Sequence, residues 1–139
     1  MTQPIYYWHI HHDKLCERAT EPIENRIEHI KFSKPQDEIE LRLRLLKPVK
    51  STKAIAEMDK IEQAENAYDE AIALLWKAFD EAIASSSIFF IEAKVYKETI
   101  APSENAIASA KKAIEESTAP SWKVIEEEHK KECVNCPRN

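Results

Sequence analysis

Apolar residues follow two kinds of pattern in the first third of the chain. Residues 5–12, IYYWHIHH, are rich in aromatic and β-branched side chains, which is typical of a strand. Residues 39–45 alternate between apolar and charged side chains, and this period of two predicts a half-buried strand. Between them, apolar residues recur every three or four positions from residue 15 to residue 30, which predicts a helix. Strand, helix and strand together predict a small βαβ head, most simply with parallel strands.

Proline positions set the expected limits of that first helix. Pro22 lies inside the helical pattern, so the helix either kinks there or begins there, with Thr20 as its N-terminal cap. Pro35 is expected to end it. A sheet of two strands is only marginally stable, so the head needs a further helix or a partner chain.

After Pro48 the apolar residues follow the period of a straight α-helix. Residues 51–101 contain neither Pro nor Gly, and apolar side chains recur there at steps of three and four. An 11-residue repeat lies on this pattern, because AYDEAIALLWK is followed directly by AFDEAIASSSI, and degenerate copies begin at Val95 and Ala113. Eleven residues make three helical turns, so each copy presents the same face. We therefore expect a mostly α protein of the α+β class, with a long helical hairpin or bundle after the head.

The expected domain limits follow these changes of pattern. The segments are a βαβ head, an acidic helical repeat region and a Cys-x-x-Cys tail, over residues 1–50, 51–132 and 133–139. The helical region is expected to break where Ser or Pro interrupts it, at residues 85–87, Pro102 and Pro120. Its most apolar stretch, residues 88–96, is expected to lie deepest in the bundle.

Composition narrows the classes of function. The net charge is −5 and acidic residues outnumber basic ones in the helical region, so binding to nucleic acid is unfavourable. Glycine is absent, which excludes the Gly-rich loops that bind phosphate. No apolar run reaches the length of about 20 residues that crosses a membrane, and MTQPIYYWHI lacks the features of a signal peptide. With 3 cysteines, an odd number, we expect a reduced, cytoplasmic protein.

The end of the chain, HKKECVNCPRN, contains the best candidate for chemistry. His129, Cys133 and Cys136 have the spacing of zinc ligands, and a closed structural site needs a fourth ligand. The head offers four residues for this place: His9, His11, His12 and Cys16. Two other interpretations stay open, a reversible thiol pair and a helix end with two spare thiols. A thioredoxin-like role fits poorly, because that motif opens a helix and this one follows a helix. Zinc is therefore the candidate cofactor.

The combination of motifs resembles one protein family. YWHIHHD, RLRLLKPVK, the AYDEAIA-type repeats and HKKECVNCP are similar to segments of a family of uncharacterised proteins from phage and environmental bacteria. In that family a similar head and a similar Cys-x-x-Cys tail flank a variable number of 11-residue repeats. The resemblance implies a helical spacer of variable length and a bacterial or phage setting, and it implies no catalytic mechanism.

Two classes of function compete. The favoured class is a non-enzymatic protein that binds an unidentified protein partner, with an inhibitor or adaptor acting on a host protein as a special case. Its candidate interaction surface is acidic and consists of Asp69, Glu70, Asp80 and Glu81. The other class is a small metal-dependent enzyme or nucleic-acid-processing factor that uses the N-terminal His cluster and the Cys-x-x-Cys tail. No catalytic constellation is recognisable, so we assign no catalytic residue. We also expect a homo-oligomer, most simply a dimer.

Overall fold

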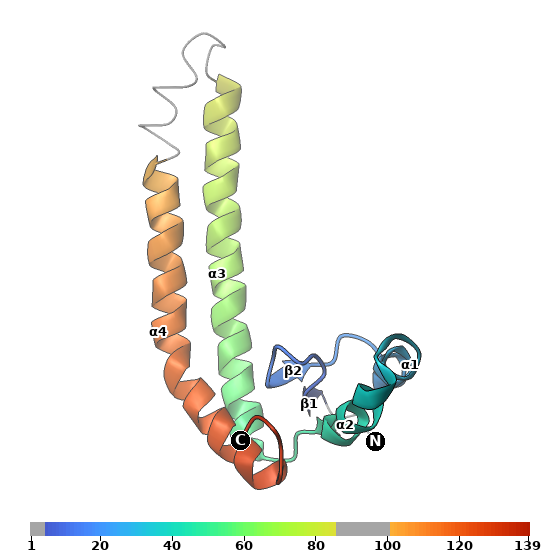
Figure 1. Ribbon diagram of the computed structural model, residues 1–139. Helices are drawn as coiled ribbons and strands as arrows, with labels where there is room; N and C mark the ends of the chain where they lie inside the picture. The colour runs from blue at the N-terminus through green and yellow to red at the C-terminus, as the bar shows by residue number, and fades with distance from the viewer. Residues whose placement is uncertain (1–4, 86–100) are drawn as a thin grey trace. The chain divides into compact units, whose positions relative to one another are not determined.

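The computed structural model describes residues 5–85 and 101–139 of the chain (Figure 1). This part is 72% helical, with four helices and a small three-stranded antiparallel sheet near the N-terminus. The expected fold class, a mostly helical protein in which long helices follow a small head with strands, is confirmed. Contacts divide the chain into two compact units. The described residues of Met1–Asp59 and Ser121–Asn139 form the first unit, and those of Lys60–Pro120 form the second.

The sheet of the first unit has β1 (Tyr6–Trp8) at its centre, between β2 (Cys16–Arg18) and β3 (Lys47–Pro48). Both pairings are antiparallel, with Trp8 opposite Cys16 on one side and opposite Lys47 on the other. All three residues of β1 are buried, as expected for a central strand. The parallel βαβ arrangement that we expected is therefore wrong, because β2 returns directly beside β1.

A tight turn explains why the first strand is shorter than expected. His9 has a φ of 57°, in the left-handed region that few residues other than glycine adopt. Its backbone N–H donates to the Leu15 carbonyl at 3.0 Å and closes the turn that leads into β2. The segment expected to open the first helix is therefore a strand, and α1 (Ile23–Ser33) begins after Pro22. Thr20 does not cap α1, whose N-terminus has no side-chain cap.

The second expected strand is a helix, α2 (Gln36–Leu45), which begins directly after Pro35. Its Leu, Glu and Arg residues are strong helix formers, and Glu38 pairs with Arg42 at 2.6 Å, one helical turn apart. On a helix, residues two positions apart such as Ile39 and Leu41 point to nearly opposite sides. The alternation therefore spreads the apolar side chains around α2, and none of its residues is fully buried.

Two long helices make up most of the remaining chain, α3 (Thr52–Ser85) and α4 (Ala101–Glu132). Pro102 lies in the first turn of α4, where a helix tolerates proline because the N–H that it lacks would have no partner there. The break expected at Pro120 is wrong, because α4 continues through it. A long helix with a packed face can absorb the loss of one hydrogen bond. The fold-back expected after Ser85 and the apolar stretch at residues 88–96 lie outside the described residues.

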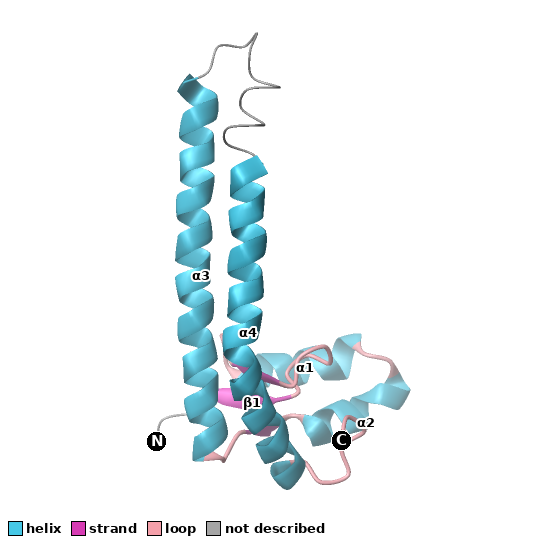
Figure 2. Ribbon diagram, turned by 90° about the vertical axis from the view of Figure 1, so that its left-hand side faces the viewer, coloured by secondary structure: helices cyan, strands magenta, loops and turns pink. Residues whose placement is uncertain are grey.

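The core of the first unit joins both ends of the chain. It contains apolar side chains from the sheet, α1, the first turns of α3, the last turns of α4 and the tail: Tyr6, Tyr7, Trp8, Ile10, Cys16, Ile30, Val49, Ala54, Met58, Ile125, Cys133 and Cys136. In the second unit, α3 and α4 run side by side in both views (Figures 1 and 2). Within the described part of the chain, no helix combines the length and the apolar content that a bilayer crossing requires.

Candidate metal centre

Four side chains with metal-ligand chemistry meet in the core of the first unit. His9, His129, Cys133 and Cys136 each offer one donor atom, and these atoms all lie within 4.8 Å of one another. All four residues are buried, and Cys133 is fully inaccessible. One of them comes from the N-terminal head and three come from the C-terminal segment. The group could therefore hold a metal ion between the two ends of the chain.

The end of α4 places two of these residues. His129 lies in the last turn of α4, and Cys133 directly follows the helix. The backbone N–H of Cys133 donates to the His129 carbonyl at 2.7 Å, so the helical hydrogen-bonding pattern continues to Cys133. Residues four positions apart share one helix face, which explains why the imidazole and the thiol point to the same place.

A turn after α4 brings back the second thiol. Asn135 adopts a φ of 61°, and asparagine tolerates this left-handed conformation better than most residues. The turn is held by Asn139, whose side-chain amide donates to the Cys133 carbonyl at 2.8 Å. The Asn139 backbone N–H also donates to the Cys136 carbonyl at 3.0 Å. The chain thus wraps around the two thiols without glycine.

His9 closes the group from the other end of the chain. Its Nε2 atom lies 2.9 Å from Nε2 of His129, 3.7 Å from Sγ of Cys133 and 3.4 Å from Sγ of Cys136. The positive φ that ends β1 at His9 also sets the direction of its side chain. The unusual backbone conformation therefore serves both the turn and the metal group.

Burial sets the protonation of these groups. It lowers the pKa of His9 from 6.5 to about 4, with a further contribution from the nearby His129. Burial likewise lowers the pKa of His129, followed by the charge of Arg138. It raises the pKa of Cys133 to about 11, and a hydrogen bond with Cys136 adds to the effect. The imidazoles are therefore neutral near pH 7, as metal ligands must be, whereas the Cys133 thiol keeps its proton until a metal displaces it.

The chemistry of the donor set is compatible with zinc. Two cysteine sulfurs and two histidine nitrogens make up a common structural zinc site. In a tetrahedral site the usual bond lengths put two nitrogens about 3.3 Å apart and a nitrogen and a sulfur about 3.6 Å apart. The observed separations from Nε2 of His9, between 2.9 and 3.7 Å, lie close to these values. All separations among the four donor atoms stay within 4.8 Å.

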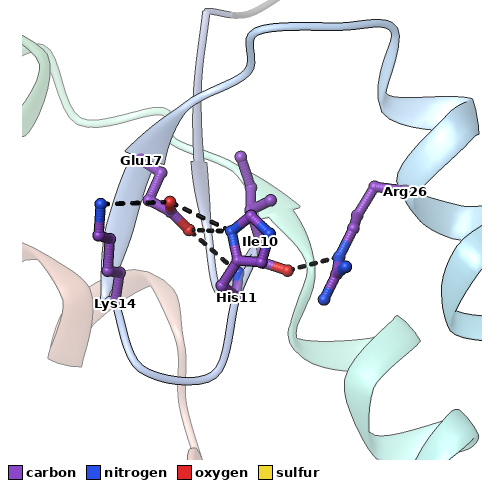
Figure 3. A network of polar contacts seen from close by, with 5 residues as sticks. All are labelled: Ile10, His11, Lys14, Glu17 and Arg26. Carbon is purple, nitrogen blue, oxygen red and sulfur yellow. Dashed lines mark hydrogen bonds and ion pairs between the residues drawn. The ribbon is translucent and has the colours of Figure 1, made fainter. Parts of the chain in front are cut away.

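The other candidates for the fourth ligand lie elsewhere. His11 is exposed and turns toward Glu17, with its Nδ1 atom 2.9 Å from the carboxylate (Figure 3). His12 is exposed as well. Cys16 is buried in β2 opposite Trp8 but is not one of the four grouped residues, and burial raises the pKa of its thiol to about 12. Of the four residues considered, the structure brings His9 to the tail.

The acidic residues proposed as an interaction surface lie on α3, in the second unit. They are all exposed: Asp69, Glu70, Asp80 and Glu81. The two pairs are eleven residues apart, so three helical turns separate them on the same face. They are thus accessible to a partner and far along the sequence from the metal group.

Two residues around the metal group, Trp8 and Glu132, lie inside the quoted sequence motifs but were not among the candidate site residues. Trp8 is fully buried, and its ring lies 5.2 Å from that of His129 in an edge-to-face contact. Its indole Nε1 donates to the carboxylate of Glu132 at 2.8 Å. Because these residues are 124 positions apart, no local pattern could have paired them.

The chain matches no known protein family, no curated protein and no solved structure at a significant level. Interpretation of the site therefore rests on its own residues and geometry.

Proposed function

We infer that the protein binds a protein partner without catalysing a reaction, and that a structural zinc ion stabilises its N-terminal head. The observation that carries the metal site in this proposal is the convergence of four buried donor atoms from the two ends of the chain within 4.8 Å, and the partner surface rests on the exposed acidic residues of α3. The ion would be bound by His9, His129, Cys133 and Cys136. It would link the sheet to the end of α4, two parts of the first unit that are far apart in the sequence.

The completeness of the donor set favours a structural role over a catalytic one. A catalytic zinc has three protein ligands and keeps a fourth position for water or substrate, whereas structural zinc is surrounded by four protein ligands. Here the protein supplies four donors, and His9, the most exposed of them, is only 8% accessible. Such burial leaves a substrate little access to an ion bound there. This argues against the metal-dependent enzyme that the N-terminal His cluster first brought into consideration.

The long helices supply the surface for a partner in this proposal. The acidic residues of the surface on α3 are exposed and repeat after three helical turns, so a basic protein surface could contact both pairs at once. An inhibitor or adaptor acting on a bacterial host protein would fit this arrangement. The metal centre would then be a structural element that keeps the head folded.

Charge reversal tests the interaction surface. Replacing Asp69, Glu70, Asp80 and Glu81 by lysine is expected to abolish capture of a specific partner from bacterial lysate, because attraction to a basic surface becomes repulsion. The matched control reverses the same number of exposed acidic residues on α4: Glu115, Glu116, Glu126 and Glu127. Pull-downs compared by mass spectrometry should show the partner with the wild type and the control only. Loss of the partner in both variants would show that only net charge matters.

Self-association is a separate prediction. We propose that the protein is a homodimer in solution, because its strands are few and large apolar side chains such as Leu74 and Trp76 remain exposed on α3. Light scattering at micromolar concentrations is expected to give about twice the mass of one chain, which is 16.1 kDa. A mass near that of one chain over the whole concentration range would reject the dimer and leave the zinc proposal intact.

A further inference from the structure

The end of α4 and the residue after it carry two neighbouring pairs of side chains with different partners. His129 and Cys133 belong to the metal group, and Glu128 and Glu132 precede each of them by one position. Residues four apart share a face, so the two glutamates lie side by side on a face next to that of the ligands. A movement of the backbone at this end of the helix would therefore displace both pairs together.

Glu132 connects the metal group to two distant segments. Its Oε2 atom accepts hydrogen bonds from Nε1 of Trp8 at 2.8 Å and from the backbone N–H of Lys50 at 3.0 Å. Its Oε1 atom lies 3.2 Å from the same Lys50 nitrogen. Trp8 in turn contacts the ring of His129 edge to face. The carboxylate thus adjoins one ligand in sequence and reaches another through the indole ring.

Glu128 holds the start of α3 in the same way. Its Oε2 atom accepts a hydrogen bond from Oγ of Ser51 at 2.7 Å. The same hydroxyl oxygen accepts the backbone N–H of Ala54 at 3.2 Å, so Ser51 caps the N-terminus of α3. Two carboxylates beside the positive end of the helix dipole add favourable electrostatics. Glu128, one position before the candidate ligand His129, therefore supports the residue that caps α3, and Glu132 holds the backbone just before that cap.

We propose that Glu132 is a positioning residue that couples the metal centre to the first turn of α3. The inference rests on the proposed zinc centre and adds that its affinity for zinc depends on the docking of α3. Zinc fixes the end of α4, which places Glu128 and Glu132 against Lys50 and Ser51. In return, the docked α3 holds Cys133 and His129 in the geometry that zinc requires. Such coupling is reciprocal, so each event strengthens the other by the same factor.

The test compares three single variants. Glu132→Ala leaves the buried Trp8 N–H without a partner, whereas Glu132→Gln keeps one carbonyl oxygen for it. Glu127→Ala is the matched control, because Glu127 is exposed on the same turn. Zinc affinity is measured by competition with a chelator. We expect Glu132→Ala to weaken it about 10- to 100-fold, as is typical of residues that orient metal ligands. The zinc affinity of Glu132→Gln should lie between those of the wild type and Glu132→Ala, and the affinity of Glu127→Ala should equal that of the wild type.

Hydrogen exchange at the start of α3, compared with and without zinc, tests the coupling separately from zinc affinity. Zinc is expected to slow exchange of the Ala54 and Ile55 amides, in the first turn of α3, in the wild type. In Glu132→Ala saturated with zinc this protection should be lost, and if that variant does not fold, Glu132→Gln with zinc should show reduced protection. Affinity within about twofold of the wild type, or full protection in the variants, would overturn the coupling. Absence of zinc binding by the wild type would instead reject the zinc centre itself.

Discussion

Removal of zinc is expected to lower the free energy of unfolding of the first unit by about 4 kcal/mol when free zinc is about 1,000 times its dissociation constant. The reason is that the four donors come together only in the folded chain, so zinc binds the folded state and not the unfolded one. The double variant Cys133→Ser, Cys136→Ser should show the same loss with zinc present. Urea unfolding followed by tryptophan fluorescence measures it, because Trp8 lies beside His129.

A histidine pair outside the metal group provides the control for this experiment. His11 and His12 are exposed, so the His11→Ala, His12→Ala variant should retain the full stabilisation by zinc. The His9→Ala variant should lose most of it. Equal effects of zinc on the wild type and the double cysteine variant would contradict the site. Equal losses from the His9 and the His11/His12 variants would contradict the assignment of the fourth ligand.

Acidification is expected to weaken zinc binding about 100-fold for each pH unit between pH 8 and pH 7, because two thiol protons must leave for each zinc bound. Burial raises the pKa of Cys133 to about 11 and lowers the pKa of His9 to about 4. The thiol is therefore protonated before binding over this whole range, and His9 is neutral. Histidines with the ordinary pKa of 6.5 would add further proton competition below that pH and steepen the dependence.

Calorimetry measures the proton count directly. Zinc titrations in buffers with different enthalpies of ionisation should give about two released protons per zinc at pH 7.5. Release of about one proton, or none, would mean that one or both thiols do not bind the ion.

The long helices could be predicted from the sequence because a single pattern extends over many turns. Apolar residues at steps of three and four mark the inner side of α3, where Ala54 and Met58 are buried. The order of the head could not be predicted, because short segments allow two interpretations. In α2 the alternation of apolar and charged residues favoured a strand, whereas helix-forming residues and the Glu38–Arg42 pair favoured a helix.

The candidate metal centre was only partly predictable. The spacing of His129, Cys133 and Cys136 is local, so it indicated three donors directly. The fourth could not be chosen among the head residues, because the choice depends on the positive φ of His9, which turns the chain at the end of β1. A turn with positive φ is usually recognised in a sequence by its glycine, and here the residue is a histidine. The contact between Trp8 and Glu132 depends on the tertiary fold alone.

X-ray absorption spectroscopy of the protein purified without an affinity tag and loaded with zinc tests the central claim most directly. The expected spectrum has two sulfur neighbours at about 2.3 Å and two nitrogen neighbours at about 2.0 Å from zinc, at about one zinc per chain. The Cys133→Ser, Cys136→Ser variant should lose the sulfur shell. A shell of nitrogen and oxygen only in the wild type, or less than about 0.2 zinc per chain, would contradict a centre built from His9, His129, Cys133 and Cys136.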